Sequence, residues 1–174
     1  MKRLAKPALD AGEVHAVCIG SVTDQAVAVR HQMATAEILR LAQLYDTRAI
    51  VNQLHLFQAA ERGQSNQLVA GAVTKGDMTD LYTSQMVKRK MPARSYYDRL
   101  MLCAPLGKCP YCGFGQVSTL DHFLSKARYP SFSVLPFNLV PSCSDCNHGK
   151  GSGVVDENNQ IPHPYYEVEL IESD

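Results

Sequence analysis

The chain has 174 residues, 45% of them hydrophobic and 20% charged, as in an ordinary soluble globular protein of one domain plus, at most, a small module. It has no apolar run of about 18 residues, which excludes a transmembrane helix, and no apolar segment follows its basic start, so we expect a cytoplasmic protein without a membrane partner. The net charge of zero hides a basic middle, because residues 75–150 carry ten Lys and Arg against five Asp and Glu, whereas residues 151–174 carry six acidic residues and no basic one.

The first hundred residues are predicted to be mainly helical. Asp10 and Glu13 have the spacing of a capping box, and apolar residues recur behind them at helical intervals. A longer helix is expected from residue 23 or 24 to about Tyr45. Its predicted buried stripe consists of Val29, Met33, Ile38, Leu41, Ala42 and Tyr45.

Residues 47–62 fit either a helix or a strand, and we favour a helix. A loop is expected at residues 63–66, followed by a helix near Asp77 that ends in a basic run. Pro92 is expected to open one more helix, because proline is tolerated in a first helical turn. No recognisable catalytic arrangement occurs in this part. Its last basic side chains are predicted to be either phosphate contacts or a solvated helix end: Lys88, Arg89, Lys90, Arg94 and Arg99.

Six cysteines occur in the chain, and four of them form two C-x2-C pairs. Cys18 and Cys103 stand alone in apolar surroundings and are interpreted as small buried residues. In a chain without an export signal, the paired cysteines indicate a metal site rather than disulfides. Four thiolates leave no open position on a tetrahedral ion, so the pattern predicts a structural Zn²⁺. The predicted ligands are Cys109, Cys112, Cys143 and Cys146.

Between the two cysteine pairs, polar residues follow a β-like segment. Residues 117–120 are predicted to be a strand that leads into Asp121 and His122. Neighbouring side chains on an ideal strand point to opposite faces, so one of the two can face a metal while the other faces a water molecule, or a β-bulge can bring them together. Asn138 precedes the second cysteine pair, and Asn147 follows it at the expected start of a helix.

These residues and their order resemble the HNH endonuclease family over residues 108–152. The resemblance rests on Asp121-His122, on Asn138 in N-L-V-P-S-C and on Asn147 in C-x2-C-N-x2-K. The third signature position is often histidine in the family and is Asn147 here, with His148 one residue out of register. The family's ββα-metal mechanism implies that His122 is the general base and that Asp121 and Asn147 hold a catalytic Mg²⁺ or Mn²⁺.

The resemblance also implies that Asn138 constrains the loop that orients His122. By position and charge, the candidate nucleic-acid contacts are Lys126, Arg128 and Lys150.

We therefore expect an α+β protein in which a mainly helical part, residues 1–100, precedes an HNH module with structural zinc, residues 101–166, and an acidic tail, residues 167–174. The expected function is a metal-dependent endonuclease acting on nucleic acid, with double-stranded DNA as the expected substrate. The family resemblance makes bacterial antiphage defence or restriction its expected setting, and the helical part would control substrate access or dock a partner. Two alternatives stay open: a zinc-stabilised nucleic-acid-binding or adaptor module without catalysis, and a nuclease subunit active only with a partner such as an ATPase. Besides nucleic acid, a protein partner or a homo-oligomer stays open for this chain.

Overall fold

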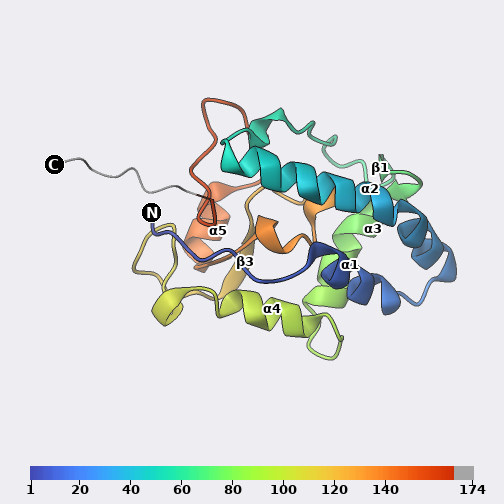
Figure 1. The fold of residues 1–174 in the computed structure, drawn as a ribbon, viewed down its shortest axis with the longest axis horizontal. Helices are drawn as coiled ribbons and strands as arrows, with labels where there is room; N and C mark the ends of the chain where they lie inside the picture. Colours follow the sequence, from blue (N-terminus) through green and yellow to red (C-terminus); the bar gives the residue numbers. More distant parts are fainter. Residues whose placement is uncertain (167–174) are drawn as a thin grey trace.

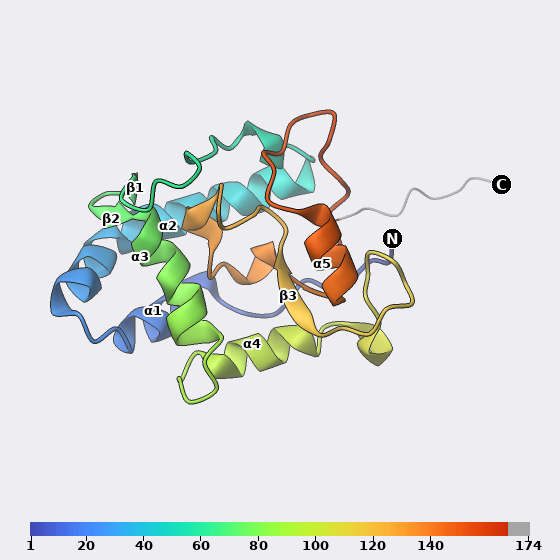
Figure 2. The same ribbon diagram turned by 180° about the vertical axis from the view of Figure 1, so that it is seen from behind.

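The computed structural model describes residues 1–166, which contain α-helices and two small antiparallel sheets (Figures 1 and 2). This mixture agrees with the α+β class that was expected, and the predicted acidic tail lies outside the described residues. Within residues 1–166, no helix combines the length and the apolar character needed to cross a membrane. The helices are α1 (Ala11–Gly20), α2 (Gln25–Ile50), α3 (Lys75–Asp80), α4 (Arg94–Met101) and α5 (Ser144–Lys150). The strands are β1 (Leu68–Ala70), β2 (Val73–Thr74), β3 (Thr119–His122) and β4 (Leu139–Ser142).

The first two helices begin at the aspartates that the sequence indicated. The Asp10 carboxylate accepts the N–H of Glu13, but Glu13 does not complete a capping box and instead accepts the hydroxyl of Tyr96. Asp24 caps α2 through the N–H groups of Ala26 and Val27. α2 then continues to Ile50, beyond the predicted end near Tyr45, and runs along the upper part of the molecule in Figure 1.

The buried face of α2 differs from the predicted stripe. Val29 is 43% exposed and Met33 is 81% exposed, so both point to solvent. Small side chains occupy much of the face that packs on the rest of the protein, which lets neighbouring elements approach the helix closely. The prediction was wrong at these two positions because it took size and hydrophobicity as the sign of burial. The buried residues of α2 are Ala28, His31, Ala34, Ile38, Ala42, Tyr45 and Ala49.

The helix favoured for residues 47–62 is wrong beyond Ile50. Asn52 takes a left-handed conformation with φ of 56°, which ends the helix, and a short 3₁₀ turn follows at Leu54–Leu56. β1 and β2, which the sequence did not reveal, form a hairpin with Gly71 in its turn at a φ of 51°.

The predicted helix near Asp77 is present as α3, capped by a reciprocal box between Thr74 and Asp77. It continues without interruption into a π-helical turn, Leu81–Met86. Pro92 lies two residues before α4 instead of inside it. The π-helical turn packs against α1 and α4, and it directs Tyr82 toward the second half of the chain.

β3 and β4 pair in antiparallel register, with Asp121 opposite Val140 and His122 opposite Leu139. β3 runs through His122, two residues beyond the predicted strand end, so both polar residues belong to the strand itself. α5 follows β4 and packs against β3. Figures 1 and 2 show β3 with α5 beside it, between α2 on one side and α4 on the other.

Both hydrophobic cores combine residues from the two halves of the chain. One core joins residues of α1 and the α3 region, such as Val14 and Met78, to Leu120 and Leu139 of the β3–β4 pair. The other joins α2, through Tyr45, to the segment that follows β3 and to the residues near position 165. The front helices therefore form part of the surroundings of the β3–β4–α5 unit.

Candidate functional site

Four cysteine side chains meet where the segment before β3 approaches the start of α5. Their sulfur atoms all lie within 4.8 Å of one another, and the Sγ atoms of Cys112 and Cys143 are 3.9 Å apart. Thiolates about 2.3 Å from a tetrahedral zinc ion lie about 3.8 Å from each other, so this spacing fits one metal ion such as zinc. It is too long for a disulfide. The cluster consists of the four predicted ligands, Cys109, Cys112, Cys143 and Cys146.

Two glycines allow the chain to turn around this cluster. Gly113 has a φ of 79°, a conformation that other residues rarely adopt. A Cβ atom on Gly115 would lie 2.9 Å from Cys143 Sγ and 3.2 Å from Cys112 Sγ, so only glycine fits there. The N–H groups of Phe114 and Gly115 point at the Cys112 sulfur, and they lower the pKa of this thiol to about 7.

A second feature, a cavity of about 310 Å³, lies beside this cluster between β3, α5 and the π-helical turn. Its wall brings together three of the residues selected from the sequence, Asp121, His122 and Asn147. Lys126 and, from the front half of the chain, Tyr82 also contribute to it. The cavity is therefore lined by a carboxylate, an imidazole, a carboxamide, an ammonium group and a phenol.

The His122 ring is held in one tautomer. Its Nε2 atom lies 2.9 Å from the carbonyl oxygen of Ser133, which can only accept, so Nε2 carries the hydrogen and Nδ1 of the neutral ring is an acceptor. Tyr82 packs edge-on against the ring with the centroids 4.4 Å apart. Burial lowers the pKa of His122 to about 3, and Lys126 and Lys150 add to this effect. The ring is therefore neutral at physiological pH.

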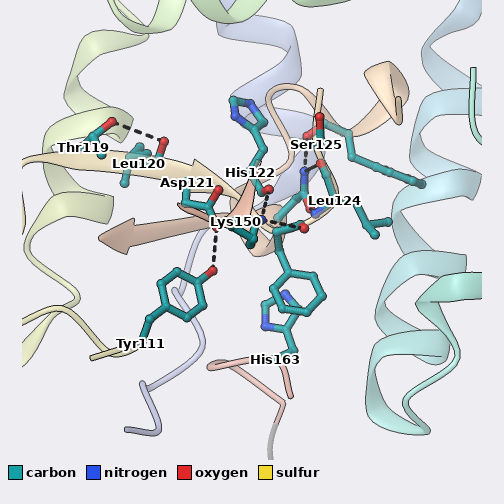
Figure 3. A network of polar contacts seen from close by, with 12 residues as sticks. Tyr111, Thr119, Leu120, Asp121, His122, Leu124, Ser125, Lys150 and His163 are labelled. Atoms are coloured by element: carbon teal, nitrogen blue, oxygen red, sulfur yellow. Dashed lines mark hydrogen bonds and ion pairs between the residues drawn. The ribbon is translucent and has the colours of Figure 1, made fainter. Parts of the chain in front are cut away.

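The Asp121 carboxylate has two partners, and both contact the same oxygen atom. Tyr111 donates its hydroxyl hydrogen to Oδ2 over 2.7 Å, and the Lys150 ammonium lies 2.8 Å from Oδ2 (Figure 3). Among the described residues, Oδ1 has no hydrogen-bond donor. This leaves one carboxylate oxygen free to bind a cation.

Asn138 is completely buried, and its carboxamide makes four hydrogen bonds. Oδ1 accepts the N–H of Leu124 at 2.7 Å and the hydroxyl of Tyr45 at 3.0 Å. Nδ2 donates to the carbonyl oxygens of Leu124 at 3.0 Å and Phe132 at 3.1 Å. Asn138 thus ties Leu124, just after β3, to Phe132, and the next residue, Ser133, carries the carbonyl that holds His122. It has no direct contact with the imidazole and acts as a positioning residue.

Asn147 and His148, which both follow the second cysteine pair, have side chains that point in different directions. Asn147 lines the cavity, whereas His148 is exposed and its Nδ1 atom lies 2.8 Å from the carbonyl oxygen of Ser144, on its own helix. α5 begins at Ser144, three residues before the predicted start, so Cys146 and Asn147 both lie within the helix.

The three predicted nucleic-acid contacts have different surroundings. Lys126 lines the cavity, with its ammonium 4.9 Å from the ring centroid of Tyr82. Arg128 donates from Nε to the carbonyl oxygen of Ala60 at 2.7 Å, which attaches it to the front half of the chain. Lys150 is directed inward to Asp121 and to backbone carbonyls, and it would have to break one of these contacts to reach a phosphate.

Two tyrosines from the front half take part in the site, and the sequence did not reveal them. Tyr82 contacts His122, while Tyr45 binds Asn138 and lies 3.1 Å from Nε2 of His163. His163, interpreted from the sequence as a packing residue, is buried and stacks on Phe123 with the centroids 4.0 Å apart. Both tyrosines occur at helical spacing among apolar residues, which is also the pattern of ordinary core residues, so no sequence signal set them apart.

No family model and no solved structure matches this chain. The chain is 38% identical over 176 residues to Protein ea31 of Escherichia phage lambda. The aligned region covers 98% of this chain and 58% of that protein, so the chain spans a little more than half the length of the curated relative it matches.

Proposed function

We propose that this chain is a metal-dependent endonuclease of the HNH type with a structural zinc ion. The observation that carries the proposal is that Asp121, His122 and Asn147 line one cavity of about 310 Å³, beside a cluster of four cysteines. The resemblance gives these residues two roles in the hydrolysis of a phosphodiester: His122 as the general base, and Asp121 with Asn147 as ligands of the catalytic ion. The order β3, β4, α5 also corresponds to the ββα arrangement that the resemblance implies.

The donors around the cavity fit a divalent ion such as Mg²⁺ or Mn²⁺. Oδ1 of Asp121 and the carboxamide oxygen of Asn147 are hard oxygen ligands of the kind these ions prefer. A bound ion would neutralise charge on the scissile phosphate and on the leaving oxygen. The cysteine cluster offers four soft thiolates and suits a closed zinc site instead.

The imidazole of His122 is arranged to accept a proton. Its Nε2 hydrogen is bound to Ser133, so the lone pair of Nδ1 can take a proton from a water molecule that attacks the phosphorus atom. Tyr82 and the Ser133 carbonyl restrict the ring to this orientation. Lys126, at the edge of the cavity, can contact a phosphate oxygen.

Double-stranded DNA is the proposed substrate, and the basic charge of residues 75–150 supports a polyanionic partner. A role in antiphage defence or restriction rests on the family resemblance alone and stays a prediction.

The test compares the full chain with His122→Ala and with His148→Ala as a matched control on the exposed side of α5. Each zinc-loaded protein is incubated with supercoiled and with linear DNA and Mg²⁺ or Mn²⁺. We expect the wild type and His148→Ala to cut, and His122→Ala to lose at least about a hundredfold in rate.

Two outcomes contradict the proposal. Cutting of DNA by His122→Ala at the wild-type rate would show that His122 takes no part in the reaction. DNA binding without cutting by the wild type would favour the adaptor or the partner-dependent nuclease, and adding a protein that corresponds to the remaining part of the longer relative would separate these two.

A further inference from the structure

The cysteine cluster and the candidate cation site are connected through Asp121. Tyr111, whose hydroxyl contacts the carboxylate, stands between Cys109 and Cys112 in the sequence. Lys150, which reaches the same oxygen atom, lies at the end of α5, the helix that follows Cys143 and includes Cys146. Each cysteine pair thus has one neighbouring residue in contact with Asp121.

The Lys150 ammonium is fully occupied by this arrangement. Its Nζ atom lies 2.8 Å from Asp121 Oδ2 and donates to the His122 carbonyl oxygen at 2.5 Å (Figure 3). It also donates to the Phe123 carbonyl oxygen at 2.8 Å. The ammonium therefore binds the last two residues of β3 and the residue after them to the end of α5.

Tyr111, from the first cysteine pair, holds the same carboxylate oxygen. Because Oδ2 of a carboxylate only accepts, the Tyr111 hydroxyl is the donor in this contact. A hydrogen bond from a hydroxyl to a carboxylate is short and directional, and the length of 2.7 Å is typical of it.

We propose that the four-cysteine centre positions Asp121, the proposed cation ligand in the cavity. Tyr111 and Lys150 hold its Oδ2 atom, which directs Oδ1 toward the cation. This inference rests on the proposed function, because it assigns a role to residues that surround the proposed cation site. Tyr111 and Lys150 are positioning residues that act through Asp121. The zinc ion, bound by the cysteines, would stabilise the cation site as well as the fold.

The test measures Mn²⁺ binding to the zinc-loaded full chain in the absence of DNA, by the electron paramagnetic resonance signal of free Mn²⁺. The variants are Tyr111→Phe, Asp121→Asn and the matched control Tyr165→Phe, which removes a buried hydroxyl bound to the Leu139 carbonyl at 2.8 Å. We expect one Mn²⁺ site in the wild type, no binding by Asp121→Asn, a Kd about tenfold higher for Tyr111→Phe and an unchanged Kd for Tyr165→Phe.

The result separates the failure of this inference from that of the proposed function. Binding that depends on Asp121 but is equal in Tyr111→Phe and Tyr165→Phe overturns the positioning role and leaves the cation site in place. Wild-type protein that binds no Mn²⁺, or Asp121→Asn that binds as tightly as the wild type, overturns both.

A second measurement does not require Tyr111→Phe to fold. If the cysteine centre holds Asp121, then Asp121 also braces the cysteine centre, because coupling between two sites is reciprocal. Asp121→Asn, in which Tyr111 is intact, should therefore release zinc to a chromogenic chelator several times faster than Tyr165→Phe does. Equal rates of release would overturn the connection.

Discussion

Replacing Asn138 by alanine should destabilise the protein strongly, although Asn138 touches neither proposed metal site. The change removes the four hydrogen bonds of a completely buried carboxamide and leaves the groups that bonded to it without a hydrogen-bond partner. At about 1 kcal/mol for each hydrogen bond, the free energy of unfolding should fall by about 4 kcal/mol. Such a loss is a large part of the stability of an ordinary domain, which is about 5 to 15 kcal/mol.

Urea denaturation, followed by circular dichroism on the zinc-loaded protein, measures this loss as a shift of the midpoint. Asn158→Ala is the control, because Asn158 is exposed, and its replacement should change the free energy of unfolding by less than about 0.5 kcal/mol. A decrease below about 1 kcal/mol for Asn138→Ala would refute the assignment of Asn138 as the residue that holds the loop carrying Ser133.

Three further predictions follow from the geometry. Gly115→Ala should lower the zinc content measured by mass spectrometry, because its Cβ atom would lie 2.9 Å from a cysteine sulfur. The control Gly149→Ala, whose Cβ atom would have no neighbour within 4 Å, should keep its zinc. Equal zinc contents in the two variants would contradict the prediction. Burial lowers the pKa of His15 to about 4 in the folded chain, whereas an unfolded chain has an ordinary histidine pKa of about 6.5. Between these two values the unfolded chain binds a proton that the folded chain does not bind, so the free energy of unfolding decreases as the pH drops below about 6.5. His15→Phe should make this fall shallower by about 1.4 kcal/mol per pH unit in urea denaturation between about pH 6 and pH 4.5, and parallel curves for the two proteins would contradict the buried neutral state. Tyr82→Leu should lower the DNA cleavage rate about threefold to tenfold at unchanged zinc content, since it removes the edge-on contact with His122, and an unchanged rate would show that this contact is not needed.

The front half of the chain contributes directly to the candidate site. Tyr45 binds the carboxamide of Asn138, Tyr82 packs on His122, and the carbonyl of Ala60 holds Arg128. Substrate access and partner docking were the roles expected for these helices, and both stay predictions. Their contacts with the β3–β4–α5 unit add a further role, which is to support the residues around the cavity.

The sequence alone was sufficient where short-range chemistry decides the structure. Asp10 and Asp24 accept backbone N–H groups within three residues, so the starts of α1 and α2 were predictable. The spacing of the cysteine pairs likewise indicated a metal cluster, because four thiolates so arranged have few other stable uses in a chain without disulfides. Asp121, His122 and Asn147 were selected by resemblance, and the structure places them around one cavity.

Only the tertiary structure decided which side chains are buried and which groups they meet. Val29 and Met33 point to solvent, and alanines occupy four of the seven buried positions of α2, beside His31, Ile38 and Tyr45. Lys150, which its position and charge predicted to contact a phosphate, is directed to Asp121 because two carbonyl groups and a carboxylate meet at that point from a different part of the chain. These contacts join residues 27 or more positions apart, and no local pattern records them. The stretch from Cys109 to Lys150 thus contains two candidate metal sites, the cluster of four cysteines and the cavity lined by Asp121. Tyr111 and Lys150, which follow cysteines of the cluster in the chain, both contact the Asp121 carboxylate.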